Sequence, residues 1–154
     1  MTYEEMIARY PYFEKFKQNS AEASLRLQVI NVAADVEKAA AYDRGERYND
    51  VDDEEVDDEE VDGEDVEVDD DENGLAAYFA DSYDVTFTVA LGGNGLCYEG
   101  VKIAVAVGGP AIIVDTERRE VRGLWWSDRF ETPLDAQACN QIDEIFEEVF
   151  EANR

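Results

Sequence analysis

The chain has 154 residues, of which 39 are acidic and 13 basic, so its formal net charge is −26. This length suits a single domain, 1–154, and 45% apolar residues can form a core, which excludes a wholly disordered acidic protein. The negative field repels nucleic acids and anionic membranes but attracts basic proteins, and the absence of histidine removes the commonest general base and zinc ligand.

The cysteines and the hydropathy pattern favour a cytoplasmic protein. Cys97 and Cys139 stand apart without a CxxC motif, so we interpret them as reduced thiols, with one bridge between them as the alternative. The N-terminus is acidic and unlike a signal peptide. The longest apolar run, 103–114, contains Gly-Gly-Pro and is too short to cross a bilayer.

The N-terminal region predicts two helical segments. Thr2 and Glu5 form a capping-box pattern for a short helix that ends near Arg9, because Pro11 disfavours helical geometry at the residue before it. A longer helix is predicted from about Ser20 to Tyr42, with Asn19 as N-cap and Gly45 as a stop. Apolar residues three and four apart form one stripe on the longer helix: Leu25, Val29, Val32, Ala33, Val36 and Ala40. Aromatic residues of the first region should also pack on the core: Tyr12, Phe13 and Phe16.

Residues 50–72 form an acidic low-complexity segment. Seventeen of its 23 residues are Asp or Glu and none is basic, so only 22 acids remain in the rest of the chain against 13 bases. Its valines recur every five residues, a spacing that specifies neither a helix face nor a strand face. We therefore predict a long acidic loop. The residues expected to contact a partner are Asp52, Asp53, Glu54, Glu55, Asp57, Asp58, Glu59, Glu60, Asp69, Asp70 and Asp71.

The charge density of this loop can be compared with that of DNA. As a helix the loop would carry roughly one charge per 2 Å, near the ~1.7 Å per charge of duplex DNA, whereas fully extended it would carry roughly one per 4.5 Å. Calcium is a second interpretation, because Asp58, Glu60, Asp62, Gly63 and Asp69 fall at positions 1, 3, 5, 6 and 12 of an EF-hand-like loop. The match lacks the final Glu and a preceding amphipathic helix, so we predict no specific metal site.

The C-terminal half predicts a sheet. Strands are expected at 84–91, 98–107, 111–115 and 120–126, with 129–132 as a candidate extension. Short turns between them indicate an antiparallel meander. We therefore predict an α+β fold in which an antiparallel four-stranded meander packs against N-terminal and C-terminal helices. Lys102, Ala104 and Ala106 lie on the opposite face of the second strand, where we expect ordinary packing.

Two features of this half are candidate contacts. Trp125 and Trp126 are adjacent on a predicted strand and should point to opposite faces, so Trp126 is a candidate exposed anchor. A final helix over 134–152 has an apolar face and an acidic stripe, in which Glu144 and Glu148 are candidate partner contacts. A merely solvated face is the alternative. The predicted stripe comprises Asp143, Glu144, Glu147, Glu148 and Glu151.

The segments AVAVGGPAIIVDT, GLWWSD and QIDEIFEEVFE resemble small accessory proteins of phages and mobile elements. In charge and size the chain also resembles phage anti-restriction and anti-CRISPR proteins that mimic DNA. The resemblance implies a non-catalytic inhibitor in the host-cell cytoplasm, without cofactors. Its carboxylates would stand in for phosphates on the basic nucleic-acid-binding surface of a CRISPR effector or a restriction nuclease.

Two other functions are open at this point. The chain could be a protein-interaction module that binds through the exposed tryptophan or a sheet edge, with the acidic loop only solubilising it. It could also be an enzyme, since carboxylate pairs serve glycosidases and Mg²⁺ nucleases. Among so many acids no pair stands out, so we predict no catalytic residues.

Overall fold

The computed structural model describes residues 2, 5, 8, 9, 21–46 and 73–154. The predicted aromatic contacts at 12–16 and the acidic loop at 50–72 lie outside these residues. The predicted capping box is present, because the Thr2 backbone N–H donates to the Glu5 carboxylate and the Glu5 N–H donates to Thr2 Oγ1 at 3.2 Å. Among the described residues, none of the helices combines the length and the apolar content that a bilayer crossing requires.

Helix α2, Ala21–Asp43, confirms the predicted apolar stripe. Leu25, Val29, Val36 and Ala40 are each at most 1% exposed. Gly45 follows two residues after the end of the helix and has a φ of +74°, which glycine adopts without strain. Its N–H donates to the Tyr42 carbonyl at 2.9 Å, and the next N–H reaches the Ala41 carbonyl at 3.0 Å. This pair of bonds is a Schellman motif, so the predicted stop is confirmed.

The sheet has five antiparallel strands in the order β1-β2-β3-β4-β5. The α+β class and the meander are confirmed, but the prediction of four strands is wrong. The fifth strand has only two inward positions in six residues, Phe130 and Thr132, and this alternation is weak on its own. It forms because a two-residue connection brings it back onto β4, where Gly123 pairs with Phe130. The strands are β1 (Asp84–Gly92), β2 (Gly95–Ala106), β3 (Ala111–Asp115), β4 (Glu120–Trp125) and β5 (Asp128–Pro133).

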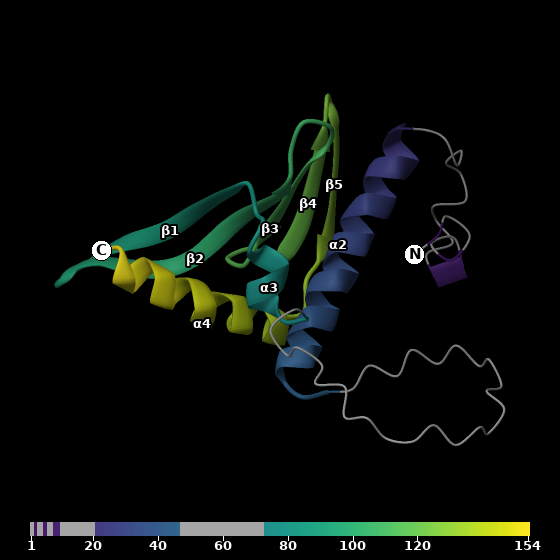
Figure 1. Ribbon diagram of the computed structural model, residues 1–154. Coiled ribbons are helices and arrows are strands. Elements are labelled where there is room, and N and C mark those ends of the chain that lie inside the picture. The colour runs from purple at the N-terminus through teal and green to yellow at the C-terminus, as the bar shows by residue number, and fades with distance from the viewer. Residues whose placement is uncertain (1, 3–4, 6–7, 10–20, 47–72) are drawn as a thin grey trace, which may run out of the picture.

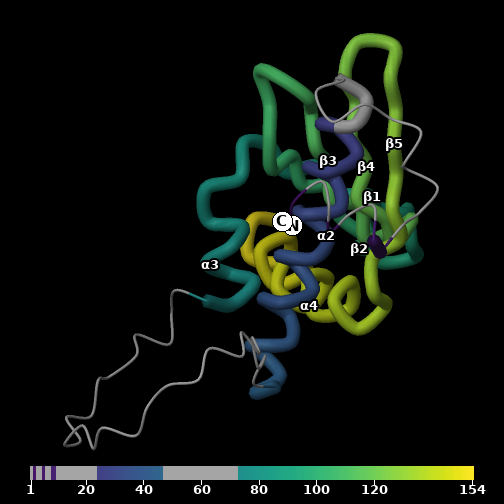
Figure 2. The backbone as a smooth tube through the Cα atoms, turned by 90° about the vertical axis from the view of Figure 1, so that its right-hand side faces the viewer, coloured from purple at the N-terminus to yellow at the C-terminus, as the bar shows by residue number. Residues whose placement is uncertain are grey.

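The helices contribute to one hydrophobic core with a single face of this sheet. Helix α2 lies along β4 and β5, and α4 (Ala136–Ala152) lies along β2 (Figure 1). A short helix, α3 (Leu75–Phe79), adds Phe79 to the core. Its ring packs edge-to-face on that of Phe146 of α4, with the two ring centroids 5.9 Å apart. Figure 2 shows the molecule from the α2 side, with α2 and α4 close together. There the Gln141 side-chain amide donates to the Ala40 carbonyl at 3.0 Å.

Gly123 of β4 lets α2 approach the sheet closely. A Cβ at this position would lie 2.4 Å from Val29 Cγ2 and 2.7 Å from Leu25 Cδ1, well inside van der Waals contact. Both of these side chains belong to the buried stripe of α2. The missing side chain on β4 therefore sets how tightly the helix packs on this half of the sheet.

Candidate partner-binding surface

Helix α4 presents an acidic face to solvent because its other face is anchored in the core. Asp135 caps the helix by accepting a hydrogen bond from the Ala138 N–H at 3.1 Å. Ala138, Ile142 and Phe146 are buried. The opposite side carries four exposed carboxylates, and we call this set the α4 acidic face: Glu144, Glu147, Glu148 and Glu151. Both predicted contacts on this helix are therefore exposed and on one side.

The prediction that Asp143 lies in the solvent-facing acidic stripe is wrong. Asp143 is half-buried, and its Oδ1 accepts hydrogen bonds from Tyr98 Oη and Thr116 Oγ1, both at 2.6 Å. Thr116 is itself buried, and its hydroxyl accepts from the Val101 N–H at 3.0 Å. Burial and the Asp143 carboxylate raise the pKa of Tyr98 well above its ordinary value of 10.0. This carboxylate is structural because the sheet turns it inward, which helical spacing alone does not predict.

Most of the α4 acidic face is uncompensated. Glu151 pairs with Arg154 at 2.9 Å, and both side chains are partly exposed, so this pair contributes little to stability. Within the part of the chain that the structure describes, no ion pair involves Glu144, Glu147 or Glu148. Their charges are therefore available to an external cation.

Trp126 is 95% exposed and lies in the two-residue connection between β4 and β5. Its neighbour Trp125 is half-buried against the core, so the prediction that one tryptophan packs inside and the other is exposed is confirmed. The predicted strand position of Trp126 is wrong, because its φ of +54° is incompatible with a strand. An L-residue rarely adopts this conformation, so a large exposed side chain is held there at some cost.

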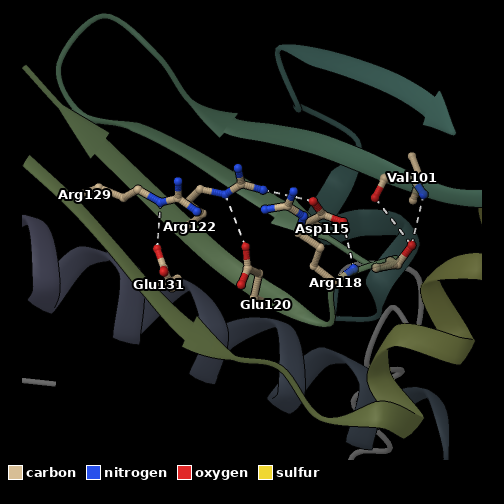
Figure 3. Close-up of polar contacts among 8 residues, drawn as sticks. Val101, Asp115, Arg118, Glu120, Arg122, Arg129 and Glu131 are labelled. Carbon is tan, nitrogen blue, oxygen red and sulfur yellow. Dashed lines mark hydrogen bonds and ion pairs between the residues drawn. The ribbon is translucent and has the colours of Figure 1, made fainter.

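The opposite face of the sheet carries a charged network that the sequence reasoning missed (Figure 3). Asp115 is fully buried, accepting from the Arg118 N–H at 3.1 Å and from the Arg122 guanidinium at 3.0 Å. Arg122 also pairs with Glu120 at 3.3 Å. Lys102 pairs with Asp115 in the β2–β3 register. This face of the sheet therefore carries charged side chains as well as the small residues Ala104 and Ala106. The strand alternation in the sequence predicted that Lys102 lies on this face, but only the pairing of the strands determined which charged residues are neighbours.

The remaining predicted contacts, from Asp52 to Asp71, lie outside the described residues. The EF-hand-like pattern at 58–69 does too, and the described part of the chain contains no group of three or more potential metal ligands. Cys97 is exposed and Cys139 is buried, and both are free, so the alternative of a bridge between them is wrong. Comparisons with protein-family models, curated proteins and solved structures found no match for this chain.

Proposed function

We propose that this chain is a non-enzymatic inhibitor whose acidic surface occupies the nucleic-acid-binding groove of a basic protein. The proposed target is a CRISPR effector or a restriction nuclease in the cytoplasm of a host cell. The observation that supports this proposal is the α4 acidic face, a row of exposed glutamates on a helix that the core holds in place. The 17 acids of residues 50–72 add to the same negative field.

The spacing of the row suits this role. Glu151 is seven residues after Glu144, about 10 Å along the helix axis, so neighbouring carboxylates of the four are about 3.5 Å apart along the axis on average. One strand of B-DNA carries a phosphate about every 3.4 Å of axis, so a groove that spaces its cations for a strand meets a similar charge density. Because Ile142 and Phe146 fix the helix from its buried side, little ordering is needed on binding.

The chemistry of this function is recognition without bond changes. Exposed carboxylates accept charge-assisted hydrogen bonds from Lys and Arg, the same donors that hold phosphates. The interaction requires no cofactor, metal or catalytic residue. Its affinity should fall steeply with salt, as expected when cationic side chains exchange counterions for a polyanion.

The test is competition for a DNA-binding nuclease. A fluorescent duplex bound to a purified restriction nuclease or CRISPR effector is titrated with the protein, and displacement is followed by anisotropy at several salt concentrations. The variant E144Q/E147Q/E148Q removes three charges from the α4 acidic face without changing side-chain size. We expect it to weaken competition by on the order of tenfold, which corresponds to about 1.4 kcal/mol.

The matched control is D81N/E117Q/D128N, which removes three charges from exposed carboxylates elsewhere. Equal losses in the two triple variants would show that only total charge matters and would contradict a role for the α4 acidic face. Deletion of 50–72 measures the contribution of the acidic run. Absence of competition at low salt across a panel of such nucleases would overturn the proposal.

A second candidate is an interaction module that binds through Trp126. The 95% exposure of this side chain favours it, because tryptophan is enriched among residues that dominate interface energies. The two candidates separate in one experiment. W126S abolishes target binding under the second candidate and leaves it nearly unchanged under the first, whereas E144Q/E147Q/E148Q has the reverse effect.

A further inference from the structure

The β1–β2 hairpin extends beyond the rest of the sheet. Strand β2 pairs with β3 only from Lys102 to Ala106, whereas it pairs with β1 down to Gly95. Residues 89–98, which we call the distal ribbon, therefore consist of two strands without a third (Figure 1). A two-stranded ribbon is marginally stable alone, so what covers its faces matters.

One face of the distal ribbon is apolar and only partly covered. Val89 pairs with Tyr98 and Leu91 pairs with Leu96, and the strand period places these pairs on the side of Phe87. Phe150 of α4 covers the inner part, with ring centroids 5.6 Å from Phe87 and 6.1 Å from Tyr98.

Beyond Phe150 this cover ends. Val89, Leu91 and Leu96 are 36%, 84% and 47% exposed, and three of the eight large exposed apolar residues of the described chain thus lie on one ribbon face. A contiguous exposed apolar surface of this kind is typical of an interaction site.

Acidic side chains border this apolar surface. Glu147 lies close enough to Tyr98 to influence its titration electrostatically. Glu151 pairs with Arg154, whose Nη2 would lie 3.8 Å from a Cβ on Gly95 at the ribbon turn. The α4 acidic face and the apolar ribbon therefore adjoin at one end of the molecule.

We propose that the distal ribbon, together with the end of α4, is a docking surface for a basic protein segment that carries apolar side chains. Lysines or arginines of the segment would meet the glutamates, and its apolar side chains would cover Leu91 and Leu96. A second copy of this chain fits poorly, because docking would bring two α4 acidic faces of like charge together. The inference rests on the proposed function for the basic character of the partner, and it adds a specific apolar contact.

The probes are two synthetic peptides of equal length and lysine count, one an amphipathic lysine–leucine helix and the other a lysine–glycine sequence. Binding is measured by anisotropy at near-physiological salt. We expect the leucine peptide to bind on the order of tenfold tighter, and L91S/L96S to remove most of that advantage. The matched control is V107S, which changes a side chain of similar exposure, 48%, just beyond the other end of β2.

Two further measurements protect the test against misfolding of the ribbon. L91Q changes only a side chain that is 84% exposed, so its circular dichroism spectrum should be unchanged. Its preference for the leucine peptide over the glycine peptide should fall, but by less than in L91S/L96S. Cys97 is the exposed thiol of the ribbon, on the face opposite Leu96, so an environment-sensitive dye attached there reports binding at this location.

The outcomes are distinct. A leucine advantage that L91S/L96S loses and V107S keeps supports the docking surface. An equal advantage in all variants overturns it while leaving the proposed function intact. Failure of both peptides to bind at low salt contradicts the proposed function and the inference together. Dimers in sedimentation velocity that L91S/L96S abolishes would assign the surface to a second copy and overturn the proposal.

Discussion

The half of the sheet under α2 and the distal ribbon are built from similar strands but differ in what covers them. In the first, Val121 is fully buried, and Gly123 on the same strand lets α2 pack closely. In the second, Leu91 and Leu96 alternate in the same way, yet α4 ends before it covers them. A strand position on the inner face of the sheet becomes buried core or exposed apolar surface according to whether a helix from another part of the chain lies over it.

The largest effect on stability is expected from a substitution at Gly123, which tests the close packing of α2 on β4. We expect G123A to lower the free energy of unfolding by about 1–3 kcal/mol, because its Cβ would overlap Val29 and Leu25. The matched control in the ribbon is G93A, whose Cβ meets no atom within 4 Å and which should change stability by less than about 0.5 kcal/mol. Urea denaturation measures both, and similar small effects would contradict close packing of α2 on β4.

The next largest effect concerns the link between the ribbon and α4. D143A leaves the Tyr98 hydroxyl without its acceptor and leaves the Thr116 hydroxyl only the Val101 carbonyl, 3.4 Å away. We expect a loss of about 1–3 kcal/mol in the free energy of unfolding. Amide hydrogen exchange should accelerate more in the ribbon than in β3–β5, since this carboxylate contacts β2 and the end of β3. Uniform acceleration across the sheet would show that Asp143 does not secure the ribbon specifically.

Alkaline pH should weaken the core next to α4. Burial raises the pKa of Cys139 from an ordinary 9.0 to about 12, with a contribution from the nearby Asp143 carboxylate. The folded chain therefore holds this proton more tightly than the unfolded chain, so stability is intact below about pH 9 and declines as the pH rises toward 12. Denaturant titrations between pH 8 and 11 should show a shallower decline in C139A than in C97A. Identical pH dependence in the two variants would contradict the burial effect at Cys139.

The smallest effect is expected at Trp126. W126G should leave the free energy of unfolding unchanged or raise it by up to about 1 kcal/mol, because glycine adopts positive φ without strain. The lost side chain is 95% exposed and contributes little to the core. Thermal unfolding provides the measurement, and a clear loss of stability would mean that the tryptophan packs on the fold rather than facing a partner.

Local patterns in the sequence were sufficient for several elements. The apolar stripe between Leu25 and Ala40 together with Gly45 predicted α2 and its end, since both are properties of consecutive residues. The amphipathic pattern likewise predicted α4 and the outward position of Glu144 and Glu148. These predictions succeeded because helix periodicity and turn chemistry act over a few residues.

Only the tertiary structure decided the rest. Strand β5 forms because it pairs with β4. Asp143 points inward because its carboxylate accepts hydrogen bonds from Tyr98 and Thr116. Leu91 is exposed because α4 ends before it covers this residue. The first depends on pairing with a neighbouring strand, and the other two depend on how α4 packs against strands that are distant from it in the chain. The sequence by itself determined the charge and most of the elements. Long-range packing determined which charged and which apolar residues are exposed to solvent, because the periodicity of a helix or strand defines its faces but not what covers them.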